Sequence, residues 1–361
     1  MNTNRLTTTL FSIGRSLAAS LITAMTTAAL ADPPGLQTGA LFLPHHEKTA
    51  PVTIWYPSRT RNTQSLHANS LYADNAVFEG VKAQRAAPIK PGAHPLVLFS
   101  HGLGGSNQSQ VWLGAALAER GAIVLFIDHP HSSRDNFNFV KATAHWTRPN
   151  DMRLALDSLL DDPFFSGSID QSRIMAAGFS YGSWTALSLG GATGNHAGLI
   201  EACITVPQIE FCDLLLSDEV RLQDQDPERW NARYADPRVT LVAAIDPGLI
   251  WGLEPSNLAE LLPSTLLIGL VSAAERLLVT DFDASGLSAI LDEQQSVRLA
   301  PAAHSTAMPL CKPEGAAILQ AEQNDPVCTD PAGTDRAAVH RAIVDLISQA
   351  LGIRVRSAIS L

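Results

Sequence analysis

The most chemically suggestive residue in this 361-residue chain is Ser180, which lies between two glycines in the stretch Gly178-Phe-Ser-Tyr-Gly182. A Gly-x-Ser-x-Gly pattern is typical of a nucleophile held on a sharp turn between a strand and a helix. Here an apolar run at 173–179 precedes the serine and a helix-like stretch at 183–191 follows it. We therefore predict that Ser180 is a catalytic nucleophile. The alternative is an ordinary serine that lies by chance between two glycines.

A serine hydroxyl needs a general base, which is usually a histidine. When the serine lies on a strand–turn–helix unit, the histidine follows it in the chain. Three histidines follow Ser180, namely His196, His304 and His340. His196 is too close to the nucleophile helix, and His340 falls on an amphipathic C-terminal helix, where a structural or surface role is expected. His304 follows the last expected strand in a loop, so we predict it as the base.

The acid that orients the imidazole is expected at the carboxyl end of a strand. Asp246 meets this condition, because it ends the apolar run 238–246 and precedes a Pro-Gly turn signal. Glu275, Asp281 and Asp283 follow the next expected strand and are alternatives. An aspartate that merely caps a turn would give the same pattern. The local sequence alone does not choose among these carboxylates.

An oxyanion needs backbone donors, and glycines allow such N–H groups to approach the developing charge closely. The sequence His-Gly-Leu-Gly-Gly at 101–105 directly follows an apolar run. We predict the Leu103 N–H and the Tyr181 N–H, just after the nucleophile, as the oxyanion hole. His101 precedes the nucleophile in the chain, so we interpret it as a residue that packs the loop.

The elements that must position these residues are short apolar runs alternating with helical patterns. The expected strands are 51–57, 95–101, 121–129, 173–180, 238–246, 264–271 and 296–301. The expected helices are 109–121, 148–162 with Asn150 as N-cap, 183–191, and 334–352 between Thr334 as N-cap and Gly352 as terminator. This alternation predicts an α/β fold with a mostly parallel sheet and helices on both faces. The charged segment 203–237 interrupts the pattern and predicts a cap or lid.

The composition is that of a folded protein, with 46% hydrophobic and 17% charged residues. The net charge of −10 and the lack of any basic run exclude nucleic-acid binding. Residues 1–31 predict a signal peptide, because an apolar stretch follows Arg5 and Arg15 and ends in a small-x-small motif at 29–31. A transit peptide is the alternative. The apolar stretch is too short for stable membrane insertion, so we expect a periplasmic or secreted protein. We expect residues 32–361 to form one domain.

The cysteines agree with export, because they are even in number and occur in two local pairs. Cys203 lies nine positions before Cys212, and Cys311 lies seventeen positions before Cys328. Four cysteines allow three pairings, and we expect each to pair with its neighbour. Four buried free thiols are the alternative. A zinc site is less expected at these cysteines because no Cys-x-x-Cys or histidine spacing accompanies them.

Together these motifs resemble the α/β-hydrolase superfamily, and within it the branch of platelet-activating factor acetylhydrolases and bacterial predicted dienelactone hydrolases. The resemblance is carried by "LVLFSHGLGG", "LAERGAIVLFIDHPHSS", "GFSYGS" and "VAAIDPGLIWGL". It implies the α/β-hydrolase fold and an acid just after the strand that follows the nucleophile helix, which is Asp246 here. It also implies His304 as base and the Leu103 and Tyr181 amides as oxyanion donors. True dienelactone hydrolases use a cysteine nucleophile where this chain has Ser180.

The residues and the resemblance together predict a secreted serine carboxylic-ester hydrolase that forms an acyl-enzyme. The expected partner is a small-molecule or lipid ester, such as a short-chain or phospholipid-type acyl ester, and no metal or organic cofactor is expected. Trp112, Trp184, Trp251 and Phe211 are candidates for lining its pocket. The alternatives are an amidase or peptidase of the same fold and a non-catalytic binding protein that kept the scaffold. The sequence does not specify an oligomeric state.

Overall fold

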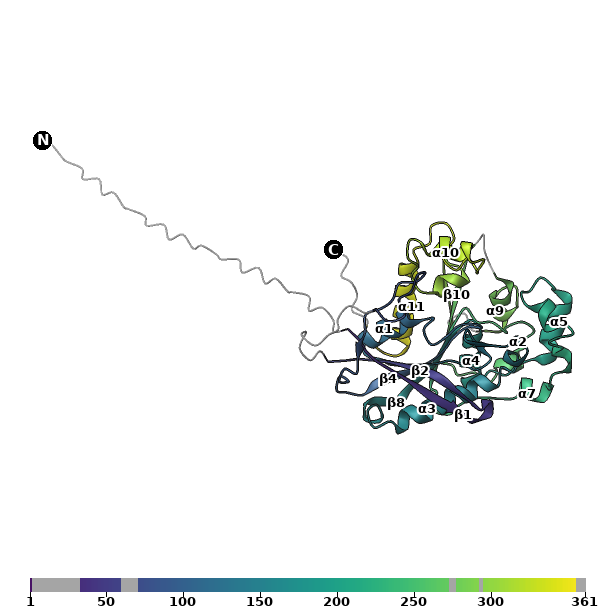
Figure 1. Cartoon of the computed structure of the whole chain (residues 1–361), viewed down its shortest axis with the longest axis horizontal. Helices are drawn as coiled ribbons and strands as arrows, with labels where there is room; N and C mark the ends of the chain where they lie inside the picture. The colour runs from purple at the N-terminus through teal and green to yellow at the C-terminus, as the bar shows by residue number, and fades with distance from the viewer. Residues whose placement is uncertain (2–32, 60–70, 273–276, 292–294, 355–361) are drawn as a thin grey trace. The chain divides into compact units, whose positions relative to one another are not determined.

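The computed structural model describes residues 1, 33–59, 71–272, 277–291 and 295–354 (Figure 1). All of the fold described here lies within Asp32–Leu361. Apart from Met1, the predicted signal peptide lies outside the described residues. Among the described residues, no helix combines the length and the apolar character that crossing a bilayer requires.

One nine-stranded sheet forms the centre of the fold, with the strand order β11-β10-β9-β8-β4-β5-β2-β1-β3. The strands are β1 (Gly35–Leu43), β2 (Lys48–Tyr56), β3 (Gln84–Arg85), β4 (His94–Ser100), β5 (Ile123–Ile127), β8 (Ile169–Phe179), β9 (Leu241–Ile245), β10 (Thr265–Leu270) and β11 (Ser296–Leu299). From β5 to β11 all neighbouring strands are parallel, whereas β2 runs antiparallel to both β5 and β1. The carboxyl ends of β4, β8, β9 and β11 therefore meet at one edge, where ligands bind in sheets of this kind.

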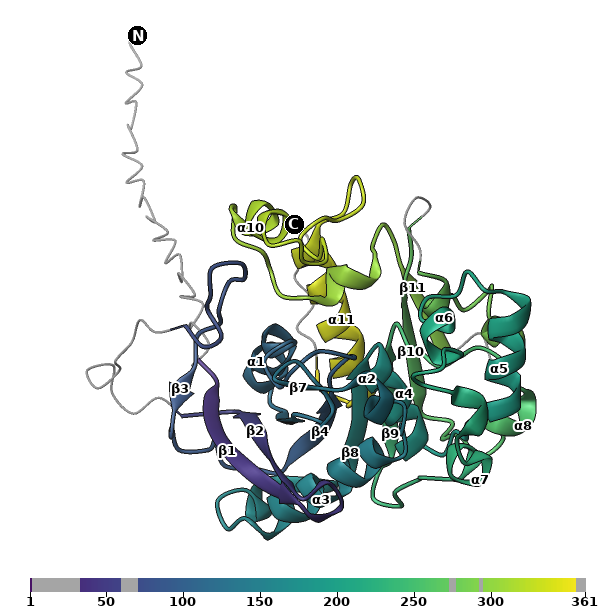
Figure 2. The ribbon, with the colours of Figure 1, turned by 45° about the vertical axis from the view of Figure 1, so that its right-hand side comes forward.

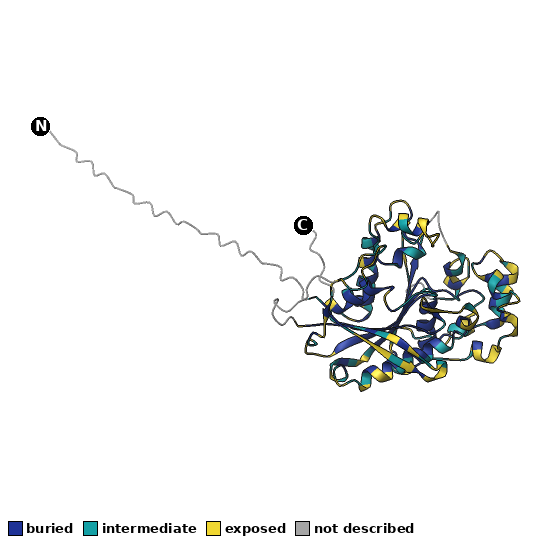
Figure 3. Cartoon of the chain, in the orientation of Figure 1, coloured by how far each residue is buried: buried dark blue, intermediate teal, exposed yellow. Residues whose placement is uncertain are grey.

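The predicted strands all occur, and those at the centre of the sheet are buried on both faces. Every residue of β4 and β5 is buried, and Figure 3 shows these strands in the dark-blue interior. A parallel strand that is covered on both sides requires such a continuous apolar run. Strand β1 was not predicted, since its sequence "GLQTGALFL" has no such run. It forms because its backbone pairs with β2 along its whole length.

Helices cover both faces of the sheet, as the alternation predicted (Figure 2). Helices α1 (Val111–Glu119) and α11 (Arg336–Ala350) share one apolar cluster, to which they contribute Trp112 and Ile343. Helices α3 (Thr147–Asp161) and α4 (Tyr181–Leu189) pack on the other face through Met152 and Trp184. Each large apolar side chain buried in this way contributes roughly 1.5–3 kcal/mol to stability.

Both predicted N-caps differ from the structure. Helix α3 begins at Thr147, so Asn150 lies within its first turn rather than at the N-cap. Helix α11 is capped by Asp335, whose side chain accepts a hydrogen bond from the Ala338 amide, and not by Thr334. Both aspartate and threonine can cap a helix, and the position of the first turn decided between the two neighbours.

A group of short helices lies between α4 and β9, where the sequence predicted an excursion. It comprises α5 (His196–Thr205), α6 (Cys212–Leu215), η3 (Leu222–Asp224) and α7 (Pro227–Asn231), which lie together on the right of Figure 2. The group begins at His196 and so is longer than the predicted 203–237. We call these helices and their connections, residues 196–237, the cap.

Both predicted disulfides are present in the structure. Cys203 bonds to Cys212 with a Cα–Cα distance of 5.1 Å and ties α5 to α6 within the cap. Cys311 bonds to Cys328 with a Cα–Cα distance of 5.8 Å and closes the segment that contains α10 (Gly315–Ala321). Each bond closes a short loop, and in the chain-entropy account it stabilises the fold by restricting the unfolded chain.

Candidate active site

Ser180 lies on a strained turn between β8 and α4. Its backbone has φ 56° and ψ −120°, a conformation that a serine rarely adopts. The two glycines of the motif leave no room for side chains, because a Cβ on Gly178 would overlap the Gly182 carbonyl and one on Gly182 would overlap Ser100. Strand, turn and helix therefore pack backbone against backbone, and this holds the serine in its unusual conformation.

Asp246 and His304 form a short hydrogen bond at the same edge of the sheet. The distance from His304 Nδ1 to Asp246 Oδ2 is 2.6 Å. The other carboxylate oxygen, Oδ1, accepts a hydrogen bond of 3.0 Å from the Leu270 amide. The Asp246 side chain is 3% exposed, so its orientation is set by these two partners. A proton on Nδ1 of His304 leaves Nε2 as a free acceptor.

The imidazole of His304 lies next to the nucleophile turn. Its ring stacks on Phe179, which directly precedes Ser180, with 4.5 Å between the ring centroids. The Ser180 amide donates to the carbonyl of Ile245, the residue before Asp246, at 2.9 Å. Among the described residues, no hydrogen bond joins the Ser180 hydroxyl to His304. Contacts of this kind often tighten only when a substrate binds.

His304 begins a short 3-10 helix, His304–Ala307, where a loop was predicted, and two buried aromatic side chains hold this helix from behind. His340 Nε2 donates to the carbonyl of Thr306 at 2.8 Å, and Trp112 Nε1 donates to the carbonyl of Ala307 at 3.1 Å. The two rings stack with centroids 3.7 Å apart. Burial lowers the pKa of His340 to about 4, so its ring is neutral at pH 7. His340 therefore has a structural role here, and Trp112 does not line the pocket.

The alternative acids have other partners. The Asp281 carboxylate accepts hydrogen bonds from the amides of Asp283 and Ala284. The Asp283 carboxylate accepts one from the Arg298 guanidinium at 2.6 Å. Glu275 lies outside the described residues. The geometry thus favours Asp246 as the partner of His304.

The two predicted oxyanion donors face the same pocket as Ser180. Leu103 and Tyr181 both line it with the serine, and a Cβ on Gly102 would lie only 3.2 Å from Ser180 Cβ. Among the described residues, the amides of Leu103 and Tyr181 donate no hydrogen bond. Two free N–H groups beside a serine hydroxyl can stabilise the negative charge of a tetrahedral intermediate.

His101 is buried and packs the loop at 101–105, as we interpreted from its position before Ser180 in the chain. Its Nε2 accepts from the His129 amide at 3.0 Å, so the proton is on Nδ1, which donates to the Gly102 carbonyl at 2.7 Å. Burial, together with the nearby Arg148 charge, holds the pKa of His101 well below its usual value. The ring is therefore neutral and is not positioned to act as a base for Ser180.

Arg148 on α3 was missed by the sequence analysis. Its buried guanidinium donates to the hydroxyls of Ser100 and Ser132 and to the carbonyl of His101. It also lies over the Tyr181 ring, 4.6 Å from the centroid. Burial lowers the pKa of Arg148 to about 10, so the group remains charged at pH 7. Arg148 thereby joins the loop at 101–105 to Tyr181, which follows Ser180, and no short motif could indicate such a contact.

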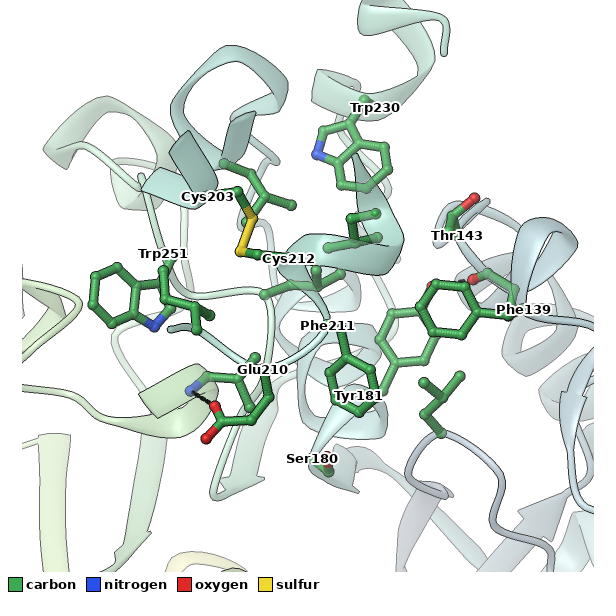
Figure 4. A pocket seen from close by; sticks show the side chains of 18 residues that line it. Phe139, Thr143, Ser180, Tyr181, Cys203, Glu210, Phe211, Cys212, Trp230 and Trp251 are labelled. Carbon is green, nitrogen blue, oxygen red and sulfur yellow. Dashed lines mark hydrogen bonds between the residues drawn. A yellow bond between two sulfur atoms is a disulfide. The ribbon is translucent and has the colours of Figure 1, made fainter. Parts of the chain in front are cut away.

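The pocket above Ser180 is largely apolar (Figure 4). Its larger side chains are Phe139, Tyr181, Phe211, Trp230 and Trp251. Of the predicted lining residues, Trp251 and Phe211 are present, whereas Trp184 is buried in the core and donates to His145. The cap contributes part of the lining, including Cys203, Phe211 and Trp230.

Comparisons with known proteins agree with this architecture. The family model described as platelet-activating factor acetylhydrolase, isoform II, matches residues 36–163. A ferulic acid esterase from Streptomyces cinnamoneus has a similar solved structure, with a TM-score of 0.56 and 18% identity over 92% of this chain and 94% of that one. No curated protein matches the sequence. The predicted α/β-hydrolase fold and the predicted resemblance to the acetylhydrolases are both confirmed.

Proposed function

Because the chain has an α/β-hydrolase fold and resembles platelet-activating factor acetylhydrolases, we propose that it is a serine carboxylic-ester hydrolase. In this proposal Ser180 is the nucleophile, His304 the general base and Asp246 the acid that orients the imidazole. The observation that carries this proposal is the position of the His304 imidazole. It forms a 2.6 Å hydrogen bond with Asp246 and stacks on Phe179, the residue before Ser180.

The reaction follows from these positions. Nε2 of His304 takes the proton from the Ser180 hydroxyl while Oγ attacks the ester carbonyl carbon. The amides of Leu103 and Tyr181 hold the oxygen that becomes negative. His304 then protonates the leaving alcohol, and an acyl group remains on Ser180. Water, deprotonated by His304, attacks this acyl-enzyme, and the acid departs as the serine regains its proton.

The pocket lining supports esters with an apolar acyl or alcohol group. Among its residues only Glu210, labelled in Figure 4, carries a charge. That carboxylate accepts hydrogen bonds from the amides of Leu278 and Val279. An apolar group would displace water from Phe139, Phe211 and Trp251, and this contributes to binding. We propose short-chain or phospholipid-type acyl esters as the substrate class.

Two disulfides in a chain that resembles the acetylhydrolases support a periplasmic or secreted location. In this proposal residues 1–31 are the signal peptide, and the mature protein folds in an oxidising compartment. Expression with and without residues 1–31, followed by fractionation and N-terminal sequencing, tests the export. A mature N-terminus other than Asp32 would contradict the predicted cleavage site.

A fluorophosphonate probe tests the nucleophile directly. We expect it to label the folded wild-type protein at Ser180 and to leave Ser180→Ala unlabelled. Ser183→Ala is the matched control, since Ser183 lies on the same helix but its hydroxyl is bonded to backbone carbonyls. Absence of labelling in folded wild-type protein would favour a non-catalytic binding protein.

Kinetics on an ester and its matched amide test the substrate class. An ester hydrolase should turn over the ester far faster than the amide. Cleavage of the amide requires protonation of an amine leaving group, whereas cleavage of the ester does not. Comparable rates on both would instead indicate an amidase or peptidase. A panel of esters of graded acyl length then defines how much of the pocket the acyl group fills.

A further inference from the structure

A second cluster of chemically capable side chains lies away from Ser180, where the turn between β1 and β2 meets α3. The turn is a short 3-10 helix, Pro44–His46, which carries His45 and His46 next to each other. Asp151 of α3 lies against them, although it is 106 positions from His45 in the chain. None of these residues takes part in the proposed ester hydrolysis.

Three ligand atoms of the cluster converge on one point. His45 Nε2 lies 2.7 Å and His46 Nε2 lies 3.2 Å from the same oxygen, Asp151 Oδ1. All three atoms are within 4.8 Å of one another. Any two ligand atoms of a tetrahedral zinc site are about 3.3 Å apart, given metal–nitrogen bonds of about 2.0–2.1 Å. The cluster therefore needs only small side-chain movements to enclose a metal ion.

The nitrogen of His46 is the feature that calls for a ligand. The His46 side chain is 5% exposed, and its Nε2 lies 3.2 Å from Asp151 Oδ1 without the geometry of a hydrogen bond to that or any other described atom. A buried side-chain nitrogen that makes no hydrogen bond is rare in folded proteins. A cation held between the two imidazoles and the carboxylate would satisfy it.

The carboxylate is already oriented for this task. Its second oxygen, Asp151 Oδ2, accepts a hydrogen bond of 2.8 Å from Nδ1 of the buried His129. A ligating carboxylate whose other oxygen is held by a second partner is the usual arrangement around a metal ion.

We propose that His45 Nε2, His46 Nε2 and Asp151 Oδ1 bind a divalent transition-metal ion of the zinc class. Two imidazoles and one carboxylate suit zinc better than magnesium or calcium, which prefer oxygen ligands. The three protein ligands leave a fourth position for water, and His45, whose side chain is 24% exposed, opens the site to solvent.

The proposed metal site is linked to the loop at 101–105 by a network of buried hydrogen bonds. His129 bonds Asp151 on one side and the Ser100 hydroxyl, at 2.9 Å, on the other. Ser100 directly precedes the loop that carries Leu103, and it also accepts from Arg148. A bound ion would thus join the β1–β2 turn to α3 and brace this network, so we expect it to stabilise the fold.

Metal binding to the full folded chain, purified without a polyhistidine tag, tests the proposal. The protein is stripped with a chelator, dialysed against zinc and magnesium, and analysed for bound metal and thermal stability. We expect about one zinc and no magnesium per wild-type chain, with a higher Tm in zinc. His45→Gln and His46→Gln should each bind zinc at least tenfold more weakly, and their Tm should not respond to zinc.

His131→Gln is the matched control, since its imidazole lies 5.6 Å from that of His46 but outside the three ligands. It should bind zinc like the wild type. His45→Gln keeps the proposal testable if the buried His46 variant fails to fold, because His45 is the more exposed ligand. The proposal is overturned if the wild type binds no zinc, if His45→Gln binds it equally well, or if His131→Gln loses it. Fluorophosphonate labelling plays no part in this readout, so failure here is distinct from failure of the proposed hydrolase function.

Discussion

His304 Nδ1 lies 2.6 Å from Asp246 Oδ2, although the two residues are 58 positions apart in the chain. Both follow parallel strands, β11 and β9, which are separated only by β10. The carboxyl ends of these strands bring the imidazole and the carboxylate to one edge of the sheet, beside the turn that carries Ser180. This relationship gives the first prediction its geometry.

Asp246→Asn should lower kcat by about 10⁴-fold, because an amide can no longer hold the imidazole in the tautomer that leaves Nε2 free. The fold should survive, since the side chain keeps its size. Asp283→Asn is the control, as Asp283 pairs with an arginine near the surface, and it should keep nearly full activity. Steady-state kinetics on a chromogenic ester measure both. If the loss followed Asp283 instead, the acid would be wrongly assigned.

Leu103→Pro should lower kcat by about 10²–10³-fold, because proline has no N–H to donate to the oxyanion. Leu103→Ala keeps the N–H and changes only the side chain, so it should retain most of the activity. Circular dichroism of both variants checks that the loop change leaves the fold intact. Equal losses in the two variants would mean that the side chain matters rather than the amide.

Phe211→Ala should raise KM for esters with bulky apolar groups more than for acetyl esters. Phe211 is a cap residue that lines the pocket, and its ring stacks on Phe139 with centroids 6.0 Å apart. Removing it takes away apolar contact area without opening the core, as it is 50% exposed. Phe42→Ala, at an exposed position on β1 outside the pocket, is the control. A uniform change on all esters would argue against a role for the cap in selectivity.

The pH dependence of stability should report the buried histidines. Burial lowers the pKa of His340 to about 4, from 6.5 for the free side chain. The unfolded chain therefore binds more protons, so the stabilising contribution is complete above pH 6.5 and is lost as the pH falls toward 4. Each such imidazole contributes a slope of up to about 1.4 kcal/mol per pH unit in this window. His129 and His145 behave in the same way.

Urea unfolding at pH 7 and pH 5 measures this slope. We expect His340→Gln to be less stable than the wild type at pH 7 but to lose less stability on acidification. The same fall in both proteins would show that His340 titrates normally in the folded state.

Local sequence carried much of the fold and part of the site. The glycines around Ser180 predict the turn, because only residues without a Cβ allow β8, α4 and β4 to approach so closely. Unbroken apolar runs predict the buried parallel strands, since both faces of such strands are covered. The cysteines pair with their nearest neighbours. In each case the signal and its structural consequence lie within a few residues of each other.

The contacts between segments far apart in the chain could not be predicted from the sequence and are seen only in the folded structure. Asp246, Asp281 and Asp283 all lie at plausible distances along the chain, and strand order and packing place just one of them against His304. Arg148 and Asp151 both lie on α3, which packs against the sheet, and from there Arg148 reaches the carbonyl of His101 and Asp151 reaches His45. Spacing along the chain says little about such pairs, since the packing of buried surfaces decides which side chains meet.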